Sequence, residues 1–139
     1  MFTQVVFKGK QAMQTDLPLY VFSFCAIVIS ILQVGLICGA PWGEWAMGGK
    51  YPGKFPPKLR VSAFIQLCII LFALLIVLIR GNVFLITYFE LSRSAVWFVV
   101  TLFGISSILN TITSSKKERI LGAPVTISML VSSLIIALS

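Results

Sequence analysis

Four long apolar stretches alternate with short polar segments along the chain. They cover Leu17–Ala40, Val61–Ile79, Ser94–Thr113 and Ile120–Leu138. At about 1.5 Å per helical residue, each stretch is about long enough to cross a hydrocarbon core of about 30 Å. The pattern therefore predicts an all-α, polytopic membrane protein in which four transmembrane helices form a bundle.

The composition favours the same placement. Hydrophobic residues make up 58% of the 139 residues and charged residues only 11%, whereas a soluble domain carries charge on roughly a quarter of its residues. The four stretches take up most of the chain. We therefore expect a single membrane domain over residues 1–139, with an ordered basic loop at 41–60 and no separate soluble domain.

The basic residues are distributed unevenly between the two sides of the predicted bundle. Seven lie in the loop 41–60 and the connection 114–119, and four lie in the N-terminal segment and the second loop. Cytoplasmic loops carry an excess of Lys and Arg, so we expect loops one and three in the cytoplasm and both termini outside. Lys8 and Lys10, just before the first stretch, favour the opposite orientation.

The second loop, residues 81–92, admits two interpretations. It can lie along the outer interface, with Glu90 solvated and the nearby Arg93 solvated as well. Alternatively, the third helix begins near Val83 and carries both charges into the membrane as an i,i+3 pair. We expect the interfacial arrangement, because charges are rarely buried in lipid.

Small residues mark one face of the first stretch, where Gly35 and Gly39 form a GxxxG motif. Small residues let helix backbones approach closely in a membrane. We expect this face to be used inside the monomer, and formation of a homo-oligomer is the alternative.

Each stretch also carries one polar residue at a similar depth below the basic side. These are Gln33, Gln66, Asn110 and Thr126, which the helical rise places about 6–12 Å inside the boundary. Amides at this depth need partners or water. The layer can be a set of hydrogen bonds between helices, or it can be the floor of a pocket that opens to the cytoplasm.

The loop 41–60 is rich in Gly, Pro and aromatic residues, a composition that favours a folded loop over a flexible linker. Trp42 and Trp45 flank Glu44, the only acid of this loop. The tryptophans fit an interfacial aromatic belt, and a salt bridge to Arg60 or Arg119 would explain Glu44. A binding role, with a cation or polar headgroup held against the tryptophans, is the functional alternative.

The third connection contains a helix start. Ser115 and Glu118 fit the S-x-x-E capping box. The neighbouring Lys116, Lys117 and Arg119 predict contact with anionic lipid headgroups, worth about 1 kcal/mol for each basic residue.

Three segments carry a resemblance to a known family. They are G-A-P-W-G-x-x-x-x-G-G at Gly39–Gly49, P-x-x-L-R at Pro56–Arg60, and N-x-x-x-x-S-x-x-E-R followed by A-P-V at Asn110–Val125. Together they resemble an uncharacterised family of small bacterial four-helix integral membrane proteins. The resemblance implies a bacterial cytoplasmic membrane and the same four-span layout. It transfers no catalytic or ligand residue.

Enzyme chemistry has little support. The chain has no His, and we find no paired carboxylates in a span, no metal-ligand cluster and no phosphate-binding loop. We expect no cofactor. The basic residues flank membrane spans and form no extended basic face, so we expect no nucleic-acid partner.

The pattern favours a binding or accessory protein that recognises a lipid or small amphipathic molecule at the cytoplasmic face. The alternatives are a small oligomeric transporter or channel, and a structural subunit beside a partner membrane protein. The candidate ligand-binding residues are Trp42, Glu44, Trp45, Arg60, Asn110, Glu118 and Arg119, with Gln33 and Gln66 beneath them.

Overall fold

The computed structural model describes the backbone of every residue except Phe84, and the side chains of all residues except Phe84 and residues 7–15. The long helices are α1 (Phe2–Cys38), α2 (Pro57–Arg80), α3 (Phe89–Ile112) and α4 (Lys116–Leu138). Three 3-10 turns complete the order, η1 (Gly43–Trp45), η2 (Met47–Gly49) and η3 (Ile86–Tyr88). The described residues contain no strand, which confirms the all-α prediction.

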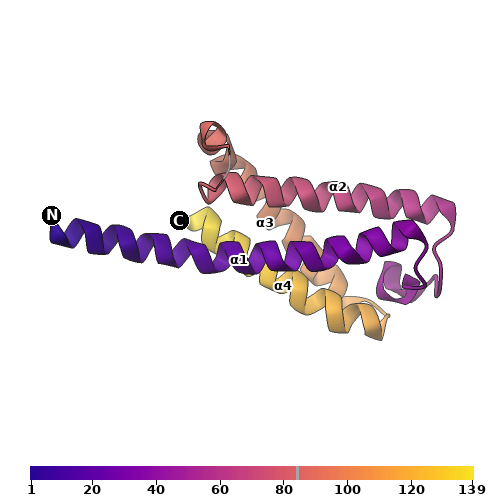
Figure 1. Ribbon diagram of the computed structural model, residues 1–139. Helices are drawn as coiled ribbons and strands as arrows, with labels where there is room; N and C mark the ends of the chain where they lie inside the picture. The colour runs from indigo at the N-terminus through magenta and orange to yellow at the C-terminus, as the bar shows by residue number, and fades with distance from the viewer. Residues whose placement is uncertain (84) are drawn as a thin grey trace.

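The helices form a ring in which each one packs against two others. α1 lies beside α2 and α4, and α3 lies beside α4 and α2 (Figure 1). The N-terminal part of α1 extends beyond the other helices (Figure 1). The loop between α1 and α2 folds back against the start of α4. We call this side of the bundle the basic end and the other side the opposite end.

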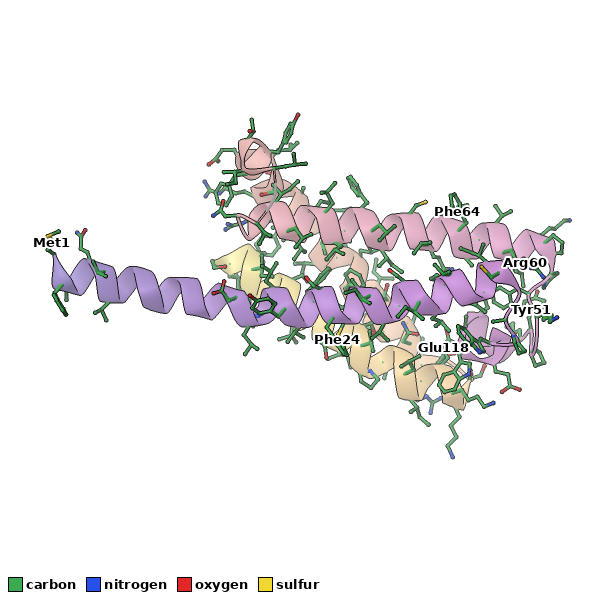
Figure 2. The ribbon with its side chains drawn as sticks, in the orientation of Figure 1. Met1, Phe24, Tyr51, Arg60, Phe64 and Glu118 are labelled. Atoms are coloured by element: carbon green, nitrogen blue, oxygen red, sulfur yellow. The ribbon has the colours of Figure 1, made fainter. Side chains whose placement is uncertain are left out.

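Four segments are long and apolar enough to cross a membrane, namely Asp16–Cys38, Pro57–Arg80, Ile86–Ile112 and Lys116–Leu138. The surface of the bundle is apolar as well, since large side chains such as Phe24 on α1 and Phe64 on α2 are exposed (Figure 2). In water this surface would be costly, whereas lipid tails cover it without penalty. The four-helix bundle is therefore built for insertion into a membrane.

The helix ends differ from the predicted spans, and each difference has a local cause. α1 ends at Cys38 because Gly39 adopts a left-handed conformation with φ 90° and closes the helix through backbone bonds to Gly35 and Leu36. α4 begins at Lys116 because the Ser115 side chain caps it by accepting a hydrogen bond from the Glu118 backbone N–H at 3.2 Å.

The third helix begins at Phe89 rather than at residue 94, directly after η3. Glu90 and Arg93 therefore lie in its first turns, where they form the i,i+3 ion pair at 3.4 Å. Both side chains are exposed.

Two apolar clusters hold the bundle together. The larger one joins all four helices, and at its centre Phe22 meets Phe103 edge to face with ring centroids 5.4 Å apart. The smaller one, at the basic end, packs Phe55 of the loop against Leu36 and Ala63. Along α1 and α2, a polar layer separates the two clusters.

The loop between α1 and α2 is folded rather than extended. The Gly43 backbone N–H donates to the Gly53 carbonyl at 2.9 Å, and a side chain at position 43 would lie 1.8 Å from the Tyr51 carbonyl oxygen. The Ser115 hydroxyl donates to the Glu44 carbonyl at 2.7 Å. These contacts fix the loop over the end of the bundle.

Candidate functional site

A cavity of about 690 Å³ lies between the four helices, beneath η1 and η2. Its walls are mainly apolar, and a few polar side chains face it from every helix. Its lining consists of Ile29, Leu32 and Gln33 of α1, residues 45–48 and Lys50 of the loop, Gln66, Ile69 and Ile70 of α2, Leu102, Phe103, Ser106, Leu109, Asn110, Ile112, Thr113 and Ser114 of α3 and its end, and Glu118, Leu121, Gly122, Val125 and Thr126 of α4.

Two amides, of the buried Gln33 and the exposed Gln66, meet in the wall of this cavity. The Gln33 Nε2 donates to the Gln66 Oε1 at 2.9 Å, which joins α1 to α2. Gln33 is only 5% exposed, and its own Oε1 is buried with no hydrogen-bond partner among the described residues. A buried acceptor without a partner is costly. The oxygen has almost no accessible surface in this conformation, so it is closed off from the cavity that Gln33 lines.

The other polar residues of the layer do not form bonds between helices. The Asn110 Nδ2 donates to the Ser106 carbonyl of its own helix at 2.8 Å. The Thr126 hydroxyl likewise donates within α4, to the Gly122 carbonyl at 2.7 Å. The alternative in which the layer is a hydrogen-bond network between helices thus accounts for Gln33 and Gln66 alone.

The turn from Trp45 to Gly48 forms a roof over the cavity. One Glu118 carboxylate oxygen, Oε2, holds it in place by accepting from the Gly48 backbone N–H at 2.7 Å and from the Thr113 hydroxyl at 2.7 Å. Glu118 thus reaches across to the loop instead of back to Ser115, so only half of the predicted capping box forms. Met47 in this roof has φ 55°, a left-handed conformation that costs a non-glycine residue about 1–2 kcal/mol.

The opening of the cavity lies between α2 and α3. Most of its exposed lining side chains belong to these two helices, namely Gln66 and Ile69 on α2 and Leu109 and Ile112 on α3. The lining residues on α1 and α4 are buried or half-buried. In a bilayer an opening between two helices faces the lipid sideways.

Five of the nine predicted site residues line this cavity. They are Gln33, Trp45, Gln66, Asn110 and Glu118. The other four, Trp42, Glu44, Arg60 and Arg119, lie outside it.

Glu44 shows the clearest departure from expectation. Its carboxylate forms an ion pair with Lys117, and not with Arg60 or Arg119 as predicted. Arg60 instead donates through Nε to the Phe55 carbonyl at 2.9 Å, and Arg119 donates to the Thr113 carbonyl. The Glu44 side chain is 42% exposed. It therefore lies at the surface of the loop rather than in the cavity.

The GxxxG motif has a role inside the chain. At Gly35 an added Cβ would lie 2.0 Å from the Trp42 ring, and at Gly39 it would lie 3.0 Å from the Arg60 guanidinium. Both glycines thus admit side chains of the same molecule, which supports the intramolecular alternative for this face.

Several lining residues were missing from the sequence-based set. Ile69 follows Gln66 by three residues and Leu102 precedes Ser106 by four, so helical periodicity would have placed them on the same faces. Met47 and Lys50 had no such signal, because the fold of the loop brings them to the cavity. In the described part of the chain, no three His, Cys, Asp or Glu side chains are grouped so as to hold a metal ion.

Comparison with known proteins found no relative of this chain. No family model matches the chain, and no curated protein and no solved structure matches it. The residues of the cavity are therefore the basis on which a function can be assigned.

Proposed function

We propose that this chain is a small multi-pass protein of a bacterial cytoplasmic membrane that binds a lipid or small amphipathic molecule in an accessory role. The basic end would face the cytoplasm and both termini the outside, in line with the distribution of Lys and Arg. The observation that carries the proposal is the cavity beneath the loop, where a polar layer from all four helices meets apolar walls.

The cavity fits an amphipathic ligand in size and in chemistry. Its volume of about 690 Å³ lies within the range of about 300–1,000 Å³ that small-molecule sites occupy. Ile69, Leu102 and Leu109 supply apolar wall. Polar groups are few and lie in the part of the cavity nearer the roof, which is the pattern of a site that orients one polar end of its ligand.

The Gln33 Oε1 supports a ligand that donates a hydrogen bond. An unsatisfied buried acceptor costs about 1–3 kcal/mol, and the rest of the layer satisfies itself within its own helices. Because this oxygen is closed off from the cavity, a hydroxyl, amide or amine group of the ligand would satisfy it once the Gln33 side chain turns toward the cavity. Gln66 holds Gln33 in place, since their side chains are bonded at 2.9 Å.

The position of the opening favours entry from the membrane. The opening lies between α2 and α3, and the exposed Lys50 of the basic loop lines the cavity. A lipid of that leaflet would pass its apolar part between the two helices and keep its headgroup near Lys50. Anionic headgroups are attracted to such basic edges.

Native mass spectrometry of the gently purified protein tests this proposal. We expect the wild type to carry one small molecule or one lipid species in stoichiometric amount, and we expect Gln33→Leu to lose it because the acceptor is gone. Glu44→Gln is the matched control, since Glu44 lies outside the cavity and its loss should leave the ligand bound.

A second variant guards against misfolding of Gln33→Leu. Ser106→Leu fills the cavity from α3 without touching the Gln33–Gln66 bond, and it should also lose the ligand. A wild type that carries only heterogeneous bulk lipid, in the same pattern as both cavity variants, would overturn the proposal.

A further inference from the structure

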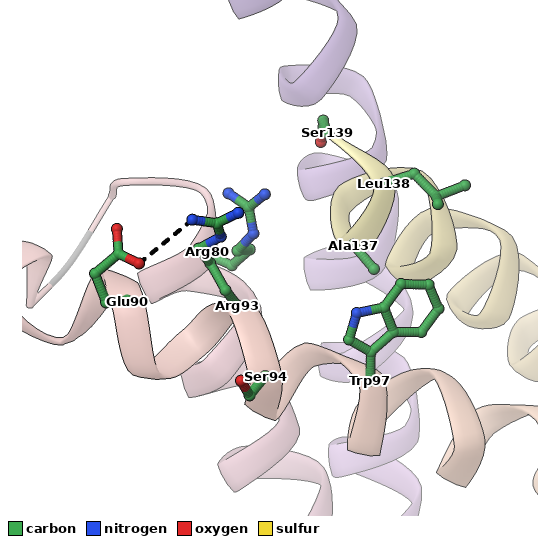
Figure 3. A pocket seen from close by; sticks show the side chains of 8 residues that line it. All are labelled: Arg80, Glu90, Arg93, Ser94, Trp97, Ala137, Leu138 and Ser139. Carbon is green, nitrogen blue, oxygen red and sulfur yellow. Dashed lines mark hydrogen bonds and ion pairs between the residues drawn. The ribbon is translucent and has the colours of Figure 1, made fainter.

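A second cavity lies at the opposite end of the bundle, between the end of α2, the start of α3 and the end of α4 (Figure 3). Its volume is about 480 Å³. In contrast to the first cavity, its most prominent groups are charged. Its lining consists of Arg80, Glu90, Arg93, Ser94, Trp97 and residues 137–139.

Two guanidinium groups lie close together on one wall of this cavity, and Trp97 and Leu138 lie on the other (Figure 3). Arg80 stacks on the Phe89 ring with its guanidinium carbon 5.0 Å from the ring centroid. Stacking of this kind fixes the plane of a guanidinium. Arg80 is thus held in one orientation at the cavity wall.

The charge at this wall is incompletely balanced. Arg93 pairs with the exposed Glu90 at 3.4 Å, whereas Arg80 takes part in no ion pair among the described residues. The Arg80 Nε is moreover buried and has no hydrogen-bond partner there. Asp16 of α1 neither lines the cavity nor pairs with these arginines. Among the lining side chains, one carboxylate therefore faces two guanidinium groups.

We propose that Arg80 and Arg93 bind in this cavity a phosphate group with uncompensated negative charge, in contrast to the phosphate of phosphatidylcholine, which its own choline balances. Guanidinium groups bind phosphate oxygens through paired N–H donors, and an anion between two like charges relieves their repulsion. Trp97 beside the site is typical of the headgroup region of a membrane. The phosphate belongs either to a lipid headgroup or to a free phosphate ester, and the experiment below distinguishes the two sources.

Fluorescence of Trp97 reports on this site alone when the other two tryptophans, both at the basic end, are replaced in a Trp42→Phe, Trp45→Phe background. The full chain is placed in nanodiscs of phosphatidylcholine with a rising fraction of brominated phosphatidylglycerol, whose bromine quenches nearby tryptophan. A second arm adds glycerol phosphate to nanodiscs of phosphatidylcholine alone.

We expect preferential quenching by the brominated phosphatidylglycerol, with apparent affinity about fivefold lower for each of Arg80→Gln and Arg93→Gln. Arg80→Lys should retain most of the affinity because it keeps the charge. Glu90→Gln should raise the affinity, since it frees Arg93 from its competing carboxylate. Lys54→Gln, an equal loss of charge at the basic end, is the control and should change nothing.

A response of Trp97 to glycerol phosphate that depends on both arginines assigns the site to free phosphate esters. Its absence, with phosphatidylglycerol quenching intact, assigns the site to lipid. Equal quenching by brominated phosphatidylcholine would overturn the proposal, as would a Glu90→Gln variant that binds more weakly. If Arg80→Gln fails to fold, Arg93→Gln and Glu90→Gln still decide, because their expected effects have opposite signs.

Discussion

Glu118→Ala should release the roof of the first cavity. The Glu118 carboxylate accepts from the Gly48 backbone N–H and the Thr113 hydroxyl, both at 2.7 Å, and it is the side chain that ties η2 to α4. A hydrogen bond to a charged group contributes about 1.5–3 kcal/mol. Only the bond to Gly48 joins Glu118 to the roof, because Thr113 lies in the connection just before α4, so we expect the opening of the loop to become easier by about 2 kcal/mol.

Limited digestion with trypsin measures this opening, because Lys50 and Lys54 lie in the loop and trypsin needs an extended segment. When opening and closing are fast, the rate of cleavage follows the population of the open loop. A change of about 2 kcal/mol corresponds to cleavage about thirtyfold faster. Glu118→Gln keeps an acceptor oxygen and should show a smaller increase.

Glu44→Gln is the matched control for this experiment. Glu44 lies in the same loop, but its ion pair with Lys117 joins two partly exposed side chains. Such pairs contribute about 0–1 kcal/mol, which limits the increase in cleavage to about fivefold. If trypsin cleaves Glu118→Ala no faster than Glu44→Gln, the conclusion that Glu118 holds the roof in place is wrong.

Three further variants test the packing. Gly35→Ala places a Cβ 2.0 Å from the Trp42 ring and should push the indole outward, at a cost of about 1–3 kcal/mol; a red shift of Trp42 emission in a background without the other tryptophans checks this. Ser115→Ala removes the cap on the Glu118 backbone N–H and the bond to the Glu44 carbonyl, and it should lower the unfolding free energy by about 1–3 kcal/mol, measured by denaturation in mild detergent. Phe22→Ala empties a fully buried site in the larger cluster and should cost about 3–5 kcal/mol in the same assay.

Each of these variants has a result that would contradict its premise. Unchanged Trp42 emission in Gly35→Ala would mean that the ring does not pack on Gly35. A Ser115→Ala protein as stable as the wild type would mean that the Ser115 side chain does not stabilise the start of α4. A loss for Phe22→Ala below about 1 kcal/mol would indicate that this core position is not closely packed.

The number and approximate position of the helices could be predicted because each apolar run is close to the length that a bilayer requires. The ends of the helices were harder. The run Val83–Phe89 is apolar, and nothing in its composition places the start of α3 at Phe89. The start of α4 was the exception, because the capping pattern of Ser115 and Glu118 lies within four consecutive residues and can be recognised in the sequence.

The sequence predicted the depth of the polar residues of the candidate site, but it could not predict which side chains they bond to. The rise of a helix places Gln33 and Gln66 at one level, and their side chains do meet. The partner of Glu44 could not be read in this way, because several cations lie at the basic end and only the path of the loop selects Lys117. Lys50 reaches the cavity for the same reason.

The bond between the roof and Glu118 also sets an order of events during synthesis. The Gly48 N–H and the Glu118 carboxylate are separated by 70 residues, which a ribosome adds in about 4–14 s at about 5–20 residues per second. Once α2 has been synthesised, α1 and α2 can pair through their glutamines, while the loop between them still lacks its bond to Glu118. The loop between α1 and α2 is thus the first connection to be synthesised, but Glu118 can hold it only after residue 118 has been added.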